Sequence, residues 1–301
     1  MSVTNLPQIP ERSSTAHKGT FGTVLGVGGS RGMSGAVALA GRAALVCGSG
    51  LVRLAVPDPI LETVAGFDPN YTTLPLPADR RGRISLTAVN TVFRHAEAAT
   101  AVFLGPGLGR SGGLDGFVKR LLKSLDKPLV VDADALNALG VPDKPFGPNI
   151  VFTPHPGEFA RLTGSALPSE ERIEERILVA QEFSKRFDVI LVLKGHATIT
   201  AQGDRVAVNS TGNPGMATGG SGDVLTGTIA SFLGQGLEPF DAARLGVYLH
   251  GLAGDFAAER VGQASVLATT IIESLPNALC SKLLHSQKIC SFFPSPSTKE
   301  L

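Results

Sequence analysis

The sequence predicts an α/β protein with a mostly parallel central sheet and helices on both faces. Short apolar runs, typical of strands that are buried on both faces, alternate with segments of helical periodicity along most of the chain. Glycine-rich turns follow several of these runs. The composition is 43% hydrophobic over 301 residues, which is enough for a large core.

The composition also excludes several classes of protein. The formal net charge is +1 and Trp is absent, so neither a basic surface nor stacking platforms for nucleic acid are indicated. No apolar run reaches the length of a membrane span. Cys47, Cys280 and Cys290 form neither a metal-binding nor a disulfide spacing, and Cys47 fits a core position. We therefore expect a cytoplasmic protein that binds neither nucleic acid nor membranes.

The first third of the chain begins with a polar arm over residues 1–18. Expected elements are a strand within 22–30, a small-residue helix over 35–48 and a strand at 51–56. The glycines after the first strand resemble a dinucleotide fingerprint only loosely, because Arg31 stands where the third glycine is required, and we reject a Rossmann NAD site. Residues 57–100 predict a helix and a basic turn. For the arginines of this turn we favour a solvated surface over a phosphate clamp; they are Arg80, Arg81 and Arg83.

The rest of the chain continues the alternation. We expect strands at 101–104, 128–131, 149–153 and 189–193, a hairpin over 198–208, and helices after residue 109, after residue 132, and over 168–187, 239–260 and 270–283. Residues 284–301 are expected to form a loose tail. Ligands of parallel sheets bind beyond the carboxyl ends of the strands, and several polar turns follow strands here.

Three of these turns carry candidate functional side chains. Asp132 and Asp134 follow a strand, where they either cap a helix or place a metal or substrate, and we leave both readings open. His155 and Glu158 lie at another strand exit, in a loop stiffened by prolines. Lys194 follows a buried strand, which favours a phosphate contact over an ordinary surface lysine.

The stretch from Asn213 to Gly227 carries the strongest signal. Apolar residues after Asp223 recur at helical spacing, so Gly219 to Gly222 are expected to form a turn and Asp223 to lie in the first helical turn. Free N–H groups at a helix start favour an anion, and glycines let the backbone approach a phosphate closely. A carboxylate there is either a partner of the helix dipole or a base that deprotonates a hydroxyl attacking phosphorus. Beside a phosphate site, we favour the base.

Several motifs, in order from about residue 15 to about 280, resemble those of the NAD(P)H-hydrate dehydratase family, nucleotide-dependent repair enzymes of ribokinase-like fold. The motifs lie at residues 17–22, 28–30, 35–36, 105–109, 132–137, 153–158, 194–195, 213–227 and 249–255. The resemblance implies a three-layer sandwich formed by one domain over residues 1–283. One departure is Thr270, which stands where the family pattern has an acid.

The resemblance also implies a reaction and its residues. A nucleotide phosphorylates the ring hydroxyl of the S epimer of hydrated NADH or NADPH, and elimination of phosphate restores the reduced cofactor. Catalysis would fall to Asp223, Gly220 and Gly222. The hydrate would contact Ala36, Gly107, His155 and Asp223. The nucleotide would contact Lys194, Gly195, His196, Ala197, Thr198, Asn213, Gly219, Gly220, Ser221 and Gly222.

Cofactors and partners follow from the same resemblance. Mg²⁺ and ADP or ATP are implied, with ADP favoured, and Glu158 is expected near Mg²⁺ through water because His155 is a poor ligand for that ion. This chain leaves no room for the epimerase that the family often fuses ahead of this domain, so we expect the epimerase as a separate chain. The small-residue helix over 35–48 predicts a homo-oligomer, a homotetramer by resemblance, although core packing explains it equally well.

Two other functions remain open on the sequence. One is a ribokinase-like small-molecule kinase that stops at a phosphorylated product, for example of a vitamin precursor. The other is a nucleotide-binding module without catalysis. A substitution at Asp223 separates the second from an enzyme, because it would leave the function of a binding module intact.

Overall fold

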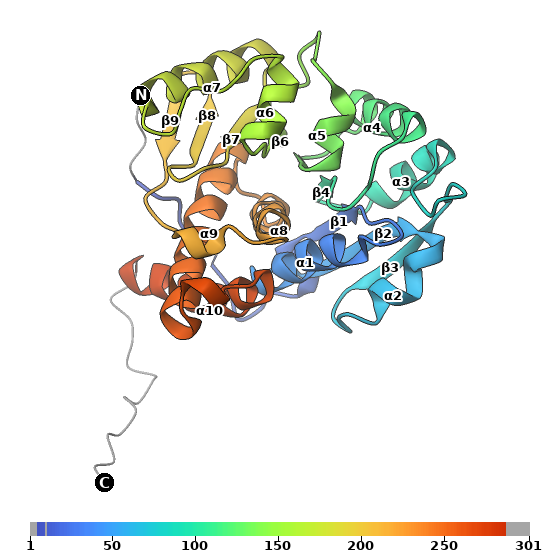
Figure 1. Cartoon of the computed structure of the whole chain (residues 1–301). Coiled ribbons are helices and arrows are strands. Elements are labelled where there is room, and N and C mark those ends of the chain that lie inside the picture. The colour runs from blue at the N-terminus through green and yellow to red at the C-terminus, as the bar shows by residue number, and fades with distance from the viewer. Residues whose placement is uncertain (1–4, 10, 287–301) are drawn as a thin grey trace.

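The computed structural model describes residues 5–9 and 11–286, and Figure 1 shows their arrangement. Within them, nine strands form one sheet in the order β3-β2-β1-β4-β5-β6-β7-β8-β9. Neighbouring strands from β3 to β7 pair parallel, and β8 and β9 continue the sheet antiparallel. The strands are β1 Thr23–Val27, β2 Leu51–Pro57, β3 Thr72–Leu76, β4 Ala101–Leu104, β5 Leu129–Val131, β6 Ile150–Phe152, β7 Ile190–Leu193, β8 Ile199–Gln202 and β9 Arg205–Val208.

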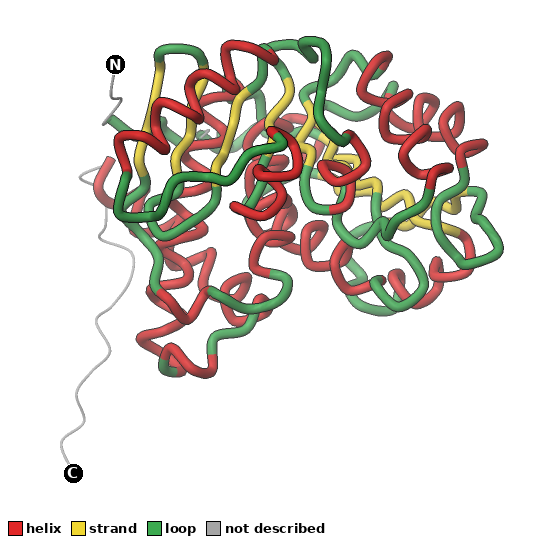
Figure 2. Tube along the Cα trace, turned by 45° about the horizontal axis from the view of Figure 1, so that its top comes forward, coloured by secondary structure: helices red, strands yellow, loops and turns green. Residues whose placement is uncertain are grey.

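Helices cover both faces of this sheet, as predicted. The helices are α1 Ser34–Val46, α2 Leu61–Ala65, α3 Val89–Ala96, α4 Gly112–Ser124, α5 Asp134–Leu139, α6 Pro156–Thr163, α7 Ile173–Phe187, α8 Ser221–Gly234, α9 Pro239–Val261 and α10 Ala268–Ser286. In Figure 1, α1, α2, α8, α9 and α10 lie on one face and α3 to α7 on the other. Figure 2 shows the strands as a layer between the two groups of helices. The predicted three-layer sandwich is confirmed.

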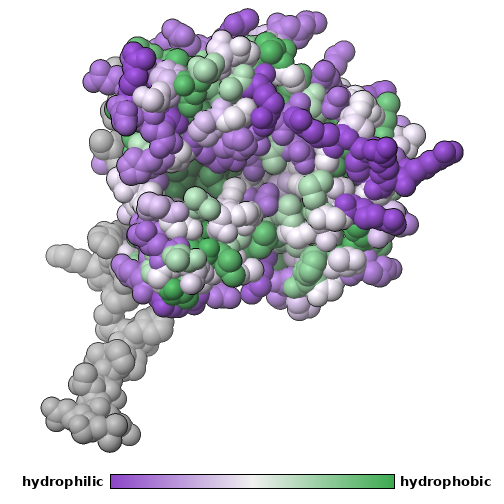
Figure 3. Space-filling view, in the orientation of Figure 1, coloured by the Kyte–Doolittle hydropathy of each residue, from purple (hydrophilic) through white to green (hydrophobic). Residues whose placement is uncertain are grey.

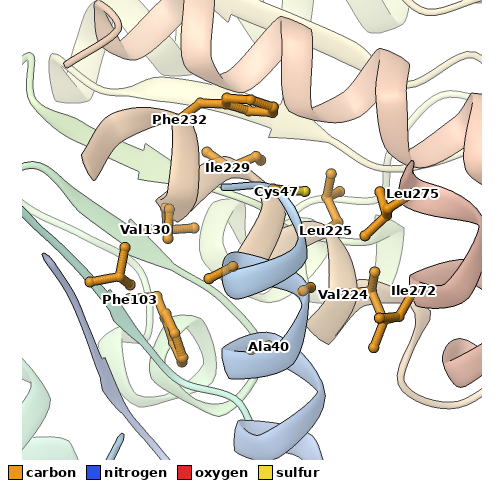
Figure 4. Close-up of a cluster of buried hydrophobic side chains, with 14 of the residues drawn as sticks. Ala40, Cys47, Phe103, Val130, Val224, Leu225, Ile229, Phe232, Ile272 and Leu275 are labelled. Atoms are coloured by element: carbon orange, nitrogen blue, oxygen red, sulfur yellow. The ribbon is translucent and has the colours of Figure 1, made fainter. Parts of the chain in front are cut away.

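Each face of the sheet has its own apolar core, and α8 lies at the centre of one of them. Figure 4 shows its apolar side chains between α1, the sheet and α10. Helices α8 and α1 pack so closely that a Cβ placed on Gly227 would lie 1.9 Å from the Ala40 carbonyl oxygen. The α8 backbone therefore sits directly against α1, which fixes the position of its N-terminus. Cys47 is buried in the same core, as predicted, and burial raises the pKa of its thiol to about 12.

Several boundaries differ from the sequence prediction. The edge strand β3 was missed, because it contains Pro75 and buries only Leu76, so it carries no continuous apolar run. Helix α7 begins at Ile173 instead of residue 168, since residues 168–172 belong to the connection from α6. Residues 284–286 form the end of α10 and not a tail, while the rest of the predicted tail lies outside the described residues.

The N-terminal arm contacts the rest of the protein through Arg12, which stacks on Phe21 and donates to the Gly48 carbonyl.

None of the helices described here, within residues 5–9 and 11–286, is long and apolar enough to cross a membrane.

Candidate active site

A cavity of about 840 Å³ opens beyond the carboxyl ends of β5, β6 and β7, beside the start of α8. Figure 3 shows the surface hollowed there, between the part over α6 and the part over the loop before α8. The predicted site residues that line the cavity are His155, Glu158, Lys194, Gly195, His196, Thr198, Asn213, Gly220, Ser221, Gly222 and Asp223. Turns far apart in the sequence thus meet at one edge of the sheet, as expected for a parallel sheet.

The N-terminus of α8 presents backbone donors to this cavity. Gly220 caps the helix with a φ of 89°, a left-handed conformation that glycine adopts without strain. No side chain caps the helix, and the first N–H groups of a helix have no acceptor within it. Gly222 leaves room for a neighbour, since a Cβ at this position would lie 3.2 Å from Lys194 Nζ. This helix end is a built anion-binding surface with a lysine beside it.

A buried charge network lies beneath that surface. Asp132 is 1% exposed and accepts hydrogen bonds from Lys194 Nζ at 2.9 Å and from the Thr226 hydroxyl at 2.7 Å. Lys194 Nζ also lies 3.9 Å from Glu158 Oε2. Burial alone would lower the pKa of Lys194, but the carboxylates of Asp132 and Glu158 outweigh it and raise the pKa above its usual value. Lys194 is therefore held charged, with its ammonium facing the start of α8.

Asp223 lies in the first turn of α8 and lines the cavity. Burial raises its pKa to about 7, and the negative charge of Asp132 adds to the shift while Lys194 opposes it. Asp134 and Glu158 contribute further negative charge. A carboxyl group with a pKa near neutrality is matched to general base catalysis at that pH. The direction of this pKa shift is opposite to that expected of a simple partner of the helix dipole, which would be stabilised in its charged form.

His155 and Glu158 form a reciprocal cap at the start of α6. His155 Nδ1 accepts from the Gly157 and Glu158 N–H groups, and the Glu158 carboxylate accepts from the His155 N–H at 2.9 Å. Burial raises the pKa of Glu158, and burial together with Lys194 lowers the pKa of His155. His155 is half exposed at the cavity wall, and its Nε2 lies 3.5 Å from Glu158 Oε1.

The expected nucleotide loop follows β7. Thr198 closes it by donating to the Gly195 carbonyl at 3.0 Å, which leaves Lys194 at one end of a compact turn. Asn213 lines the cavity, but its side chain donates to the Gly254 carbonyl and to Asp255 and accepts from the Gly215 N–H. Its side chain thus anchors the loop before α8 to α9. Ala197 and Gly219 are not among the lining residues of this cavity.

Two predicted substrate residues lie outside the cavity but next to each other. A Cβ on Gly107 would lie 3.1 Å from the Ala36 Cβ and 2.5 Å from the Met33 carbonyl oxygen. The loop after β4 therefore packs on the first turn of α1. Farther along α1, Leu39 contacts Gly220, since a Cβ on Gly220 would lie 2.6 Å from Leu39 Cδ1. Ala36 and Gly107 are thus connected to the start of α8 through α1, although they do not line the cavity.

The structure excludes one of the alternatives left open for Asp132 and Asp134, the capping of a helix. Neither side chain caps α5, whose first residues lack a side-chain cap. Asp134 accepts from the Gly109 N–H at 2.8 Å, and Asp132 belongs to the site network.

Sequence reasoning gave no functional role to Thr226 or His250. His250 is buried, lies 3.4 Å from the Ser221 hydroxyl, and has its pKa lowered to about 4 by burial. The signal for Thr226 was a polar residue on the buried face of an apolar helix.

Thr270, which stands where the family pattern has an acid, accepts from the Leu267 N–H at 3.1 Å, so at this position it stabilises the start of α10.

The acidic side chains at the cavity suit Mg²⁺ only in part. Mg²⁺ prefers oxygen ligands, keeps several waters and binds through one or two carboxylates plus substrate phosphates. Glu158 offers one such carboxylate at the wall. Over the part of the chain described, no group of three or more His, Cys, Asp or Glu side chains could hold a metal ion. The residues therefore fit an ion brought by nucleotide phosphates and not a site made by protein ligands alone.

The fold and the cavity define a ribokinase-like protein with an anion-binding helix start and a carboxylate beside it. A family model described as NAD(P)H-hydrate dehydratase matches residues 24–277. The chain belongs to the NAD(P)H-hydrate dehydratase family.

Its relatives agree with this assignment. The chain is 44% identical over 277 residues to a bifunctional NAD(P)H-hydrate repair enzyme of Moorella thermoacetica, covering 90% of this chain and 52% of that protein. It is 40% identical over 267 residues to the ADP-dependent (S)-NAD(P)H-hydrate dehydratase of Neisseria meningitidis. This match covers 85% of this chain and 84% of that protein. The ADP/ATP-dependent NAD(P)H-hydrate dehydratase of Bacillus subtilis, crystallised with ATP and Mg²⁺, superposes on this chain with a TM-score of 0.76 at 32% sequence identity. The superposition covers 91% of this chain and 94% of that one. The chain thus spans about half the length of the bifunctional relative.

Proposed function

We propose that this chain catalyses the nucleotide-dependent dehydration of the S epimer of hydrated NADH or NADPH, restoring the reduced cofactor. The observation that carries this proposal is Asp223. Its carboxyl group lies in the first turn of α8, at the cavity, with a pKa raised to about 7. Family membership supports the substrate, since the Neisseria relative is named for the same reaction.

The first step is phosphoryl transfer. The ring hydroxyl of the hydrate attacks the terminal phosphorus of the nucleotide, and Asp223 accepts the hydroxyl proton as the new P–O bond forms and the bond to the leaving nucleotide breaks. The free N–H groups at the start of α8 would donate to the phosphoryl oxygens, where charge develops. Lys194, held charged by Asp132, adds a positive charge beside them.

The second step is elimination. The ring C–O bond breaks, phosphate leaves with the bonding electrons, and the neighbouring ring carbon loses a proton as the ring double bond forms. Phosphate is a far better leaving group than hydroxide, which is why the nucleotide is needed. The same helix start that accepts the phosphoryl group also stabilises the departing phosphate.

The residues proposed to hold each ligand are those that the resemblance to the family implies. We assign the nucleotide to the Lys194–Thr198 loop and the start of α8, and the hydrate to Ala36, Gly107, His155 and Asp223. Mg²⁺ would bind to the nucleotide phosphates with Glu158 near it, and when bound it would neutralise phosphate charge. ADP is the favoured donor, in keeping with the name of the Neisseria relative. The separate epimerase, the homotetramer and the cytoplasmic location stay predictions.

The decisive experiment is an assay of repair. Purified protein is incubated with hydrated NADPH, Mg²⁺ and either ADP or ATP, and the absorbance of the reduced nicotinamide ring is followed. Recovery that depends on nucleotide and is lost in Asp223→Asn supports the proposal. A stable phosphorylated product with no recovery of the reduced ring would instead identify a kinase, and recovery by Asp223→Asn at the wild-type rate would exclude Asp223 as the base.

A further inference from the structure

Five arginines gather at one edge of the molecule, next to the Ala36–Gly107 end of the site. They come from the loop after β1, the turn after β3 and the loop after β4, and we call them the arginine rim: Arg31, Arg80, Arg81, Arg83 and Arg110. Backbone contacts join the loops, since the Arg31 N–H donates to the Gly82 carbonyl at 3.0 Å and the Arg83 guanidinium donates to the Arg110 carbonyl. Figure 3 shows hydrophilic side chains gathered at this edge, on the face that carries the hollow.

Most of this positive charge is uncompensated. Arg83 pairs with Asp79 at 2.7 Å, which fixes the turn that presents its neighbours. The exposed side chains of Arg31, Arg80, Arg81 and Arg110 form no ion pair with any residue that the structure describes. Asp134, at the same edge of the sheet, uses one carboxylate oxygen to accept from the Gly109 N–H. Five guanidiniums with two nearby carboxylates, Asp79 and Asp134, leave a net positive charge that favours binding of an anion.

The rim is continuous with the proposed hydrate site. A Cβ on Gly109 would lie 3.3 Å from Arg83 Cδ and 3.3 Å from Met33 Cε. Met33 also contacts Gly107, and α1 then leads from Ala36 to Leu39 at the start of α8. The six steps from Met33 to Leu39 span roughly 9 Å at the rise of an α-helix. A ligand with one end at Asp223 can therefore extend along α1 to the rim.

The rim is separate from the expected nucleotide loop. That loop follows β7, whereas the rim follows β1, β3 and β4. Three steps of about 4.8 Å separate β4 from β7 across the sheet, a distance of roughly 14 Å. The phosphoryl donor would occupy the β7 side, so an anion at the rim belongs to the other substrate.

We propose that the arginine rim binds the phosphate groups of the hydrated dinucleotide and gives this protein a preference for the hydrate of NADPH. This inference rests on the proposed function. A dinucleotide carries a pyrophosphate between its two nucleosides, and NADPH adds a 2′-phosphate at the adenosine end. Guanidinium groups bind phosphate oxygens in a bidentate manner, and arginine is the residue that accommodates a 2′-phosphate in other dinucleotide sites. The rim thus determines specificity and takes no part in the chemical steps.

The test uses a triple variant that removes only unpaired charges, Arg31→Gln, Arg81→Gln and Arg110→Gln. A matched control removes three exposed arginines from α3, α4 and α7, Arg94→Gln, Arg120→Gln and Arg186→Gln. The KM and kcat are measured for both hydrates, and direct binding of NADP⁺ and NAD⁺ is measured by calorimetry. We expect the rim variant to raise the KM for hydrated NADPH on the order of tenfold, with kcat and the KM for ADP unchanged.

The outcomes are distinct. A larger loss for NADP⁺ and hydrated NADPH than for NAD⁺ and hydrated NADH assigns the rim to the 2′-phosphate, as proposed. An equal loss for both assigns it to the pyrophosphate and overturns the claimed preference. Unchanged affinities, or the same loss in the control, overturn the rim as a phosphate site. If the wild-type protein repairs neither hydrate, the proposed function fails, while the calorimetric comparison still decides whether the rim binds dinucleotide phosphates.

Discussion

The carboxyl group of Asp223 is expected to cost stability at the pH where it serves as a base. Its pKa in the folded protein is raised from 3.8 to about 7, so the folded state binds the proton more tightly than the unfolded chain. Stability therefore falls as the pH rises from about 4 to about 7, because the unfolded chain ionises this group first. At 1.36 kcal/mol for each pKa unit, the full effect is at most about 4 kcal/mol above pH 7.

Replacing this carboxyl with a neutral group of the same shape should recover part of that energy. We expect Asp223→Asn to raise the melting temperature by on the order of 5 °C at pH 8, with the gain shrinking toward zero at pH 4. Turnover should fall on the order of a hundredfold or more while nucleotide binding is retained. Thermal unfolding across this pH range measures the stability, the repair assay measures turnover, and calorimetric titration measures nucleotide binding.

The matched control is Asp115→Asn. Asp115 lies in the first turn of α4, outside the cavity, where a carboxylate is a favourable partner of the helix dipole. Its replacement should lower stability slightly at pH 8, the opposite sign to Asp223→Asn. If Asp223→Asn stabilises the protein no more at pH 8 than at pH 4, the carboxyl group is not held near neutrality and the argument for a base fails.

Three further predictions test the site and the packing that positions it. The value of kcat/KM should rise with pH through about 7 as the Asp223 carboxylate forms, and an acid limb near pH 4 would contradict the raised pKa. Lys194→Met should weaken nucleotide binding and leave Asp132 as an unpaired buried charge, lowering the free energy of unfolding by roughly 3–5 kcal/mol in denaturant titrations. Adding Asp132→Asn to it should restore much of the stability but not the binding, so a double variant no more stable than the single one would argue against the pair. Gly227→Ala should destabilise the protein by roughly 1–3 kcal/mol, because a Cβ would lie 1.9 Å from the Ala40 carbonyl oxygen, and an unchanged denaturation midpoint would show that the helices can separate freely.

The buried charges show where sequence reasoning reached its limit. Asp223 and Lys194 could be proposed from local patterns, because each follows a glycine-rich turn or a buried strand. Asp132 stayed undecided between capping and function, since its partners Lys194 and Thr226 lie 62 and 94 residues away in the sequence. A pairing of that kind depends on which strands are neighbours in the sheet.

The arginines of the rim show the same limit of sequence reasoning for a surface feature. In the sequence, Arg80, Arg81 and Arg83 read as a charged turn at the surface, and the structure agrees that most of this charge is exposed. Only the folded chain brings Arg31 and Arg110 to this turn and sets Arg83 and Met33 side by side at Gly109. The proposal of a phosphate site at this turn therefore depends on residues that are distant in the sequence.

The sequence by itself determined the alternation of buried strands and helices, the glycine turn before α8 and the place of Asp223 in the first turn of that helix. These features depend on periodicity and on residues close together in the chain. Tertiary structure alone decided that Asp132, Lys194 and Glu158 surround Asp223 and that burial among them raises its pKa to about 7. Electrostatic coupling depends on distance through space and on exclusion of water, and neither quantity is encoded by spacing along the chain.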